Sequence, residues 1–154
     1  MSEEDLVRVE LVNFPVALAG RFNSHYDALR RELALVRFSD DATRAALPAR
    51  LVDVAERATQ ELGEAQVHDR DQLEADVSDG ASTVTIEALV PRGAQDTVRS
   101  LHALLVEADE LSRAGDLISV AMPPDCCAFR DWVLGEVVAQ LSGASSRPWD
   151  GATD

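Results

Sequence analysis

Residues 82–141 decide the fold; they read STVTIEALVPRGAQDTVRSLHALLVEADELSRAGDLISVAMPPDCCAFRDWVLGEVVAQL. From Thr83 to Val90, apolar residues alternate with polar ones and β-branched residues are common, which is typical of a strand. Apolar residues then recur every three or four positions, which predicts a helix that Gly115 closes in a left-handed conformation.

Two further elements complete this stretch. Residues 117–122 predict a strand that ends at a pair of prolines. Asp125 then stands where an N-cap belongs, and an apolar stripe predicts a helix from there to Gly143.

The patterns outside this stretch are consistent with the same class of fold. Residues 6–12 alternate as a strand does, and the period becomes helical after Pro15. A second amphipathic helix runs from about Leu47 to Gly63. The remaining segments are an acidic connection at residues 64–80, with a possible helical turn through Val67, Leu73 and Val77, and a tail at residues 144–154.

The order β-α-α-β-α-β-α predicts an α+β fold with four main helices and a small three-stranded mixed sheet. The strands at 83–90 and 117–122 are joined by one helix, so we expect them to be parallel with a right-handed crossover. The strand at 6–12 is reached through two helices and is free to run antiparallel. We expect one domain over residues 1–143.

Composition excludes several kinds of enzyme. All fourteen basic residues are Arg and none is Lys. P-loop NTPases and enzymes that form a Schiff base on Lys are therefore excluded in their usual form. The sequence contains no glycine-rich phosphate loop and no zinc or nucleophile motif, and we predict no cofactor.

The formal net charge of −14 opposes binding to phosphate backbones or anionic membrane surfaces. No apolar run approaches the roughly 20 residues that a bilayer-spanning helix needs, and the first residues are acidic rather than typical of a signal peptide. We therefore predict a cytoplasmic protein without nucleic-acid or membrane partners.

Half of the net charge lies between Asp53 and Asp79, where nine acidic residues accompany two arginines. Such a surface would attract a protein partner with a basic surface; the alternative is an ordinary solvated helix face. Trp149 lies in a polar tail, where it either folds back over the domain or anchors a partner. The candidate partner-binding residues are Asp53, Glu56, Glu61, Glu64, Glu107, Glu110 and Trp149.

A rival hypothesis is a small-molecule-binding or catalytic cleft near His25, Tyr26, Cys126 and Cys127. The two cysteines lie in the first turn of a predicted helix, where unpaired backbone amides favour a thiolate. A purely structural role is the alternative for both thiols. The three His residues lack metal-ligand spacing, so we predict no metal site.

Five segments stand out along the chain: Leu89-Val90-Pro91, residues 104–110, residues 129–136, Phe14-Pro15 and His25-Tyr26-Asp27. Together they resemble short, uncharacterised regulatory proteins of actinobacterial type. The resemblance implies an association with partner-switching systems, which combine anti-sigma kinases, STAS-domain antagonists and type 2C phosphatases. The chain lacks the Asp-Ser-x-Gly phosphorylation signature of the antagonists and the Asn and glycine-rich boxes of the kinases.

The leading hypothesis is therefore a non-enzymatic regulatory module for protein–protein interaction, in a sigma-factor or stress partner-switching circuit. Self-association is a further possibility, because a three-stranded sheet leaves edges and a face that a second copy could cover.

Overall fold

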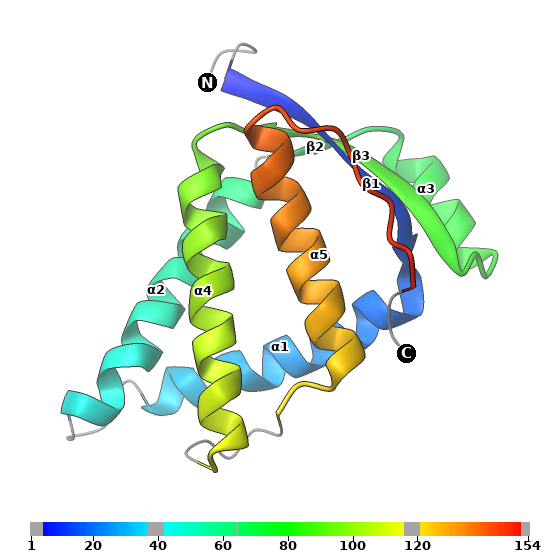
Figure 1. Ribbon diagram of the computed structural model, residues 1–154. Coiled ribbons are helices and arrows are strands. Elements are labelled where there is room, and N and C mark those ends of the chain that lie inside the picture. The colour runs from blue at the N-terminus through cyan, green and yellow to red at the C-terminus, as the bar shows by residue number, and fades with distance from the viewer. Residues whose placement is uncertain (1–4, 37–41, 64, 116–120, 152–154) are drawn as a thin grey trace.

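The computed structural model describes residues 5–36, 42–63, 65–115 and 121–151. Within these residues it contains five helices and a three-stranded sheet, and the α+β class is confirmed (Figure 1). The elements in chain order are β1 Leu6–Pro15, α1 Val16–Val36, α2 Ala42–Gly63, β2 Gln66–Val67, α3 Arg70–Ser78, β3 Thr83–Pro91, α4 Ala94–Arg113 and α5 Pro124–Leu141.

The sheet has the order β1-β3-β2, and both pairs are antiparallel. Val9 of β1 lies opposite Ala88 of β3. The register shifts between Leu11 and Phe14, where Asn13 has a φ of 60°, so β1 contains a bulge. Beyond this bulge the ring of Phe14 lies 5.5 Å from that of Phe129 on α5.

Among the described residues the sheet is antiparallel, so the predicted mixed sheet is wrong there, and its third strand is β2. Of the strand predicted at 117–122, residues 117–120 lie outside the described residues, and Ala121 and Met122 are not in a strand. β2 is only two residues long, Gln66 opposite Leu89 and Val67 opposite Ala88. Two residues cannot show an alternating pattern, so the acidic connection concealed this strand.

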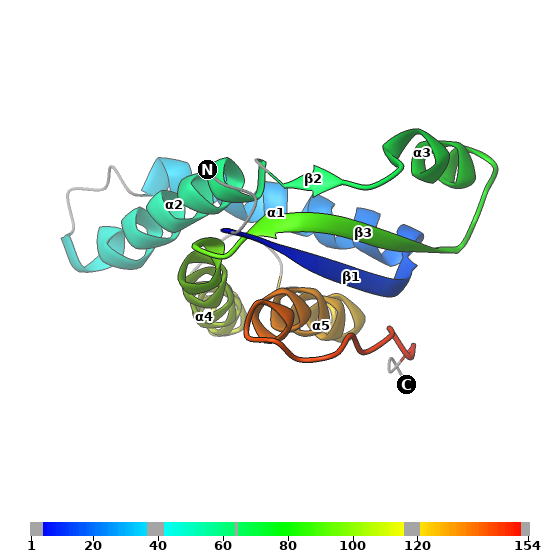
Figure 2. The same cartoon turned by 90° about the horizontal axis from the view of Figure 1, so that it is seen from above.

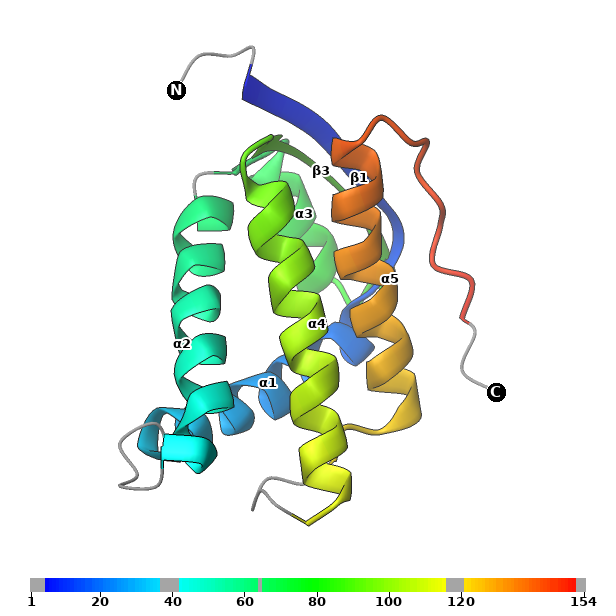
Figure 3. The ribbon, with the colours of Figure 1, turned by 60° about the vertical axis from the view of Figure 1, so that its left-hand side comes forward.

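Helices α2, α4 and α5 lie side by side beneath the sheet, and α1 crosses their far end (Figures 1 and 3). One apolar cluster joins α1, α2 and α4, and Leu33 and Ala108 at its centre are fully buried. A second cluster packs the inner face of the sheet, including Val9 and Val90, against Val98 of α4 and α5. These contacts bury the apolar stripes that the sequence predicts for the helices.

Several helix boundaries follow their sequence signals. Gly115 has a φ of 83°, as expected for the residue that closes α4. α5 begins at Pro124 rather than after Asp125, because Pro123 is its N-cap and proline is well tolerated in the first turn. Asp125 instead lies within that turn, where its side chain accepts a hydrogen bond from the amide of Cys126. α2 starts at Ala42, before the predicted Leu47.

The chain returns along β1 after α5 ends. The amide of Trp149 donates to the carbonyl of Val12 at 2.9 Å, so the predicted tail lies against the domain. Among the helices of the described residues, none combines the length and the apolar character that a membrane span requires.

Candidate functional site

The acidic segment predicted as one surface is divided between two helices. Asp53, Glu56 and Glu61 belong to α2, whereas the acidic residues after position 68 belong to α3 and its two ends. α2 and α3 lie at opposite ends of the sheet in Figures 1 and 2. The −7 charge of the sequence segment therefore does not act as one patch.

Helix α3 stands apart from the core. None of its residues is buried, and its apolar residues Leu73 and Val77 belong to none of the core clusters of the described residues. It starts after Asp69, whose φ of 54° turns the chain sharply out of β2, and it ends before Gly80 with a φ of 89°. Two residues with positive φ thus bracket a short, solvated helix.

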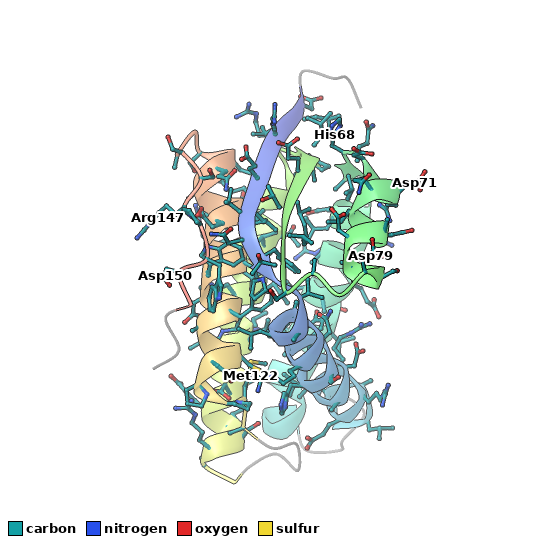
Figure 4. All side chains as sticks on the ribbon, turned by 90° about the vertical axis from the view of Figure 1, so that its right-hand side faces the viewer. His68, Asp71, Asp79, Met122, Arg147 and Asp150 are labelled. Carbon is teal, nitrogen blue, oxygen red and sulfur yellow. The ribbon has the colours of Figure 1, made fainter. Side chains whose placement is uncertain are left out.

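The charges on this helix are uncompensated. Asp69, Asp71, Glu74 and Asp79 form no ion pair with any other described residue, and Arg70 is the only basic side chain among residues 69–79. The fifth acidic residue, Asp76, accepts a hydrogen bond from Gln72 at 2.9 Å. Figure 4 shows His68, Asp71 and Asp79 on one side of the long strands, with Arg147 and Asp150 on the other.

Two open hollows lie along β3 next to the ends of α3. One of about 480 Å³ lies between residues 66–69 and the end of β3, where Arg8 pairs with Glu87 at 2.7 Å. The other, about 520 Å³, lies between the start of β3, Asn13 and the end of α3 at Asp76 and Asp79. A partner that contacts α3 can therefore also reach the outer face of the sheet.

The acidic residues on α2 and α4 have a different environment. Arg50, Asp53, Arg57 and Glu107 line a hollow of about 360 Å³ between these helices, and Arg50 lies 3.8 Å from Glu107. Two arginines and two carboxylates make this groove electrically balanced.

The remaining acidic candidates on α2 and α4 differ in their exposure. Glu56 and Glu110 are exposed. Glu61 is partly buried, and its Oε2 atom has no hydrogen-bond partner among the described residues. Glu64 lies outside the described residues.

Tyr26, Cys126 and Cys127 of the rival hypothesis contact one apolar cluster, but aromatic rings fill the space between α1 and α5. Tyr26 stacks on Phe22 with ring centres 5.9 Å apart, and burial raises the pKa of its hydroxyl. His25 forms no hydrogen bond or ion pair with another described residue. The four residues do not converge on any of the hollows described above.

The surroundings of both thiols disfavour the thiolate form. Burial, followed by the charge of Asp125, raises the pKa of Cys126. Burial and the carboxylate of Asp109 likewise raise the pKa of Cys127, whose sulfur lies 3.5 Å from the carbonyl oxygen of Met122. The thiolate that a helix start favours is therefore opposed here by desolvation and by nearby carboxylates.

Sequence reasoning missed a polar cluster between α4 and α5. Asp131 accepts a hydrogen bond from Arg130 Nε at 2.9 Å, and its Oδ1 atom lies 2.8 Å from His102 Nε2. Arg130 is only 5% exposed. No periodic signal marks a buried arginine, because its residue type indicates an exposed position.

Trp149 folds back, as one of its two sequence interpretations predicts. Its ring centre lies 5.6 Å from that of Trp132 and 6.2 Å from that of Phe129.

Comparisons with models of protein families, with curated proteins and with solved structures find no match to this chain.

Proposed function

We propose that this chain is a non-enzymatic regulatory module that binds a protein partner with a basic surface. The observation that carries the proposal is α3, a helix with no buried residue, surrounded by acidic side chains without ion pairs to described residues. The acidic residues of α2 and α4 are a weaker second surface, because arginines neutralise the groove between them.

The electrostatics of α3 favour such a partner. Like charges on one short helix repel each other, and a cationic surface removes that repulsion when it docks. Negative potential also steers a basic partner toward the helix and raises the association rate at low ionic strength. Since α3 contributes no buried residue, its side chains can be used for binding without altering the core.

The second part of the proposal concerns the regulatory circuit in which this module acts. The resemblance of Leu89-Val90-Pro91 and residues 129–136 to small regulatory proteins favours a sigma-factor or stress partner-switching system. A partner from that circuit would present Arg or Lys side chains to α3.

Affinity capture with the full chain, followed by calorimetry with the captured protein, tests this proposal. The test variant carries Asp71→Asn, Glu74→Gln and Asp79→Asn; the control carries Asp53→Asn, Glu56→Gln and Glu107→Gln. Because an exposed ion pair contributes about 0.2–1 kcal/mol and the test variant loses three carboxylates, we expect it to bind about 3- to 150-fold more weakly in low salt. The control should retain most of the affinity.

Two results would contradict the proposal. Capture of no specific protein in either low or moderate salt would count against a protein partner. A captured protein that binds both variants equally well would exclude α3 as its docking surface.

A further inference from the structure

The outer face of β3 forms the floor of an open groove, here called the trough. Side chains of a strand alternate between the two faces of its sheet, and Ala88 and Val90 pack with the inner cluster. The outer face therefore carries the alternate residues of β3, which are Thr83, Thr85, Glu87 and Leu89. At about 3.3 Å per residue, this row is about 20 Å long.

The two hollows next to α3 are successive parts of the trough. The first, about 520 Å³, reaches Thr85 on β3, and the second, about 480 Å³, begins at Glu87, so only Ile86 lies between them. The two ends of α3 border the trough on one side, and Arg8 and Asn13 of β1 border it on the other. Figure 2 shows α3 beside β3, on the side away from β1. A single element of another chain can follow this groove along β3.

The charges that line the trough are mainly negative. Asp69 borders it at the start of α3, and Asp76 and Asp79 border it at the end. None of these three carboxylates forms an ion pair with another described residue. The only arginine among the described residues of the lining, Arg8, is already paired with Glu87 at 2.7 Å. A positively charged occupant therefore complements this lining.

The trough also contains exposed apolar surface. Leu89, which lines it, is 38% exposed, and Val77 on α3 is 41% exposed. Only one other large apolar side chain of the described residues, Leu35 on α1, is exposed. Neither Leu89 nor Val77 belongs to a core cluster of the described residues. An occupant with apolar as well as basic side chains would therefore remove Leu89 from water.

The sequence argues against an occupant from this chain. A second copy carries the same net charge of −14 and would be repelled. The C-terminal tail lies on the other side of the long strands, as Arg147 and Asp150 show in Figure 4. Each segment outside the described residues contains more acidic than basic residues; these segments are 1–4, 37–41, 64, 116–120 and 152–154. Charge complementarity therefore favours a different protein.

From this lining we propose that the trough binds an amphipathic helix of the partner, with Arg or Lys side chains toward α3 and apolar side chains toward Leu89. A helix satisfies its own backbone hydrogen bonds, so it suits a floor made of side chains, and about 14 residues match the row of about 20 Å. Helices α4 and α5 cover the inner face in the same way. The inference rests on the function proposed above and adds the groove and the kind of element that it takes.

A synthetic peptide tests the trough with the full chain. Its sequence, LKALRKALKALRKA, places the leucines on one side of a helix and basic residues on the rest of its surface. Binding is followed by fluorescence anisotropy of the fluorescein-labelled peptide in about 150 mM NaCl. The same peptide with proline at its seventh position keeps every charge but breaks the helix. We expect this control peptide to bind at least about 10-fold more weakly.

Two variants of the chain add the same positive charge at different places. Thr85→Arg adds it on the floor of the trough, and Ser100→Arg adds it on the exposed surface of α4. Because the net charge changes equally, only the position of the bound peptide distinguishes them. We expect Thr85→Arg to weaken binding at least about 10-fold, and Ser100→Arg to weaken it less than about 3-fold. Circular dichroism establishes that both variants are folded.

Amide chemical shifts of the wild-type chain locate the peptide without any substitution. We expect changes at residues 83–89 and at both ends of α3. Changes confined to Asp71 and Glu74, which do not line the trough, would overturn this inference and leave α3 as the docking surface. Equal binding by the two variants, equal binding of the two peptides, or no binding at all would also overturn it. The capture experiment above measures the failure of the proposed function separately.

Discussion

At the scale of single residues, Arg130 is the least expected feature of the core. Its side chain is 6% exposed, whereas that of its counter-charge Asp131 is 53% exposed. One atom of the guanidinium, Nη1, is buried without a hydrogen-bond partner among the described residues. The carboxylate of Asp131 thus offsets part of the free-energy cost of burying the Arg130 charge. His102, on α4, contacts the same carboxylate.

The pH dependence of Asp131→Asn follows from this arrangement. Burial acts to raise the pKa of Asp131, but hydrogen bonds from Arg130 and His102 outweigh it and hold the pKa below the usual value. A lowered carboxyl pKa stabilises the folded state above the unfolded pKa, and the stabilisation is lost as the pH falls. Because Asp131 is half exposed, we expect Asp131→Asn to cost about 1–2 kcal/mol near pH 7 and much less near pH 3.

Urea denaturation of wild type and variant at both pH values measures this difference. Asp96→Asn is the control, since Asp96 is almost fully exposed and lies 3.9 Å from Arg99. It should change stability by less than about 0.5 kcal/mol. An equal loss for Asp131→Asn at both pH values would mean that the carboxylate is not what stabilises the Arg130 region.

At the scale of elements, α5 connects the helical core, the sheet and the C-terminal residues 144–151. Its inner side contributes Val137 and Leu141 to the cluster beneath the sheet. Gly143 follows the helix with a φ of 99°, and its amide donates to the carbonyl of Gln140 at 3.0 Å. This left-handed residue follows the end of α5 and directs residues 144–151 back toward β1.

We expect opposite effects of the same substitution at two glycines, one inside α5 and one just after its end. Gly135 lies within the helix, and an added Cβ would meet no atom within 4 Å. Gly135→Ala should therefore stabilise the protein by about 0.5–1 kcal/mol through better helix propensity. Gly143→Ala should destabilise it by about 1–2 kcal/mol, because the left-handed conformation is strained for alanine.

Thermal unfolding of both variants tests the pair, with a rise of the midpoint expected for Gly135→Ala and a fall for Gly143→Ala. Since both sites offer open space, steric clash does not distinguish them. Effects of the same sign would show that backbone conformation is not what separates the two positions.

At the scale of the whole molecule, charge opposes compactness. Twenty-eight acidic residues and fourteen basic ones give the formal net charge of −14. Many of the basic side chains are engaged locally, as in the pairs Arg50–Glu107 and Arg113–Asp109. The remaining acidic side chains therefore repel one another across the surface, and the basic side chains do not offset this repulsion.

Salt should stabilise this protein. Raising NaCl from about 20 mM to about 500 mM shortens the Debye length from about 20 Å to about 4 Å and weakens the repulsion, so we expect a gain on the order of 1 kcal/mol. Thermal midpoints across a salt series measure it. The α3 variant Asp71→Asn, Glu74→Gln, Asp79→Asn should gain less from salt than the wild type; an equal or larger gain would contradict a repulsive role for these residues.

The amino-acid sequence by itself determined the features that depend on neighbouring residues. The strand at 83–90, the helix that Gly115 closes and the helix that ends at Gly143 follow from period and end signals within one turn or one strand. The α+β class follows from their order. Excess negative charge is likewise a property of composition alone.

Only the tertiary structure decided which distant residues meet. The third strand is Gln66–Val67, whose two residues carry no pattern and pair only because β3 lies beside them. The tertiary structure also buries Arg130, separates the two halves of the acidic segment on α2 and α3, and places Trp149 next to Val12. Such contacts depend on the burial of apolar surface from many elements at once, whereas a periodic pattern describes one element at a time.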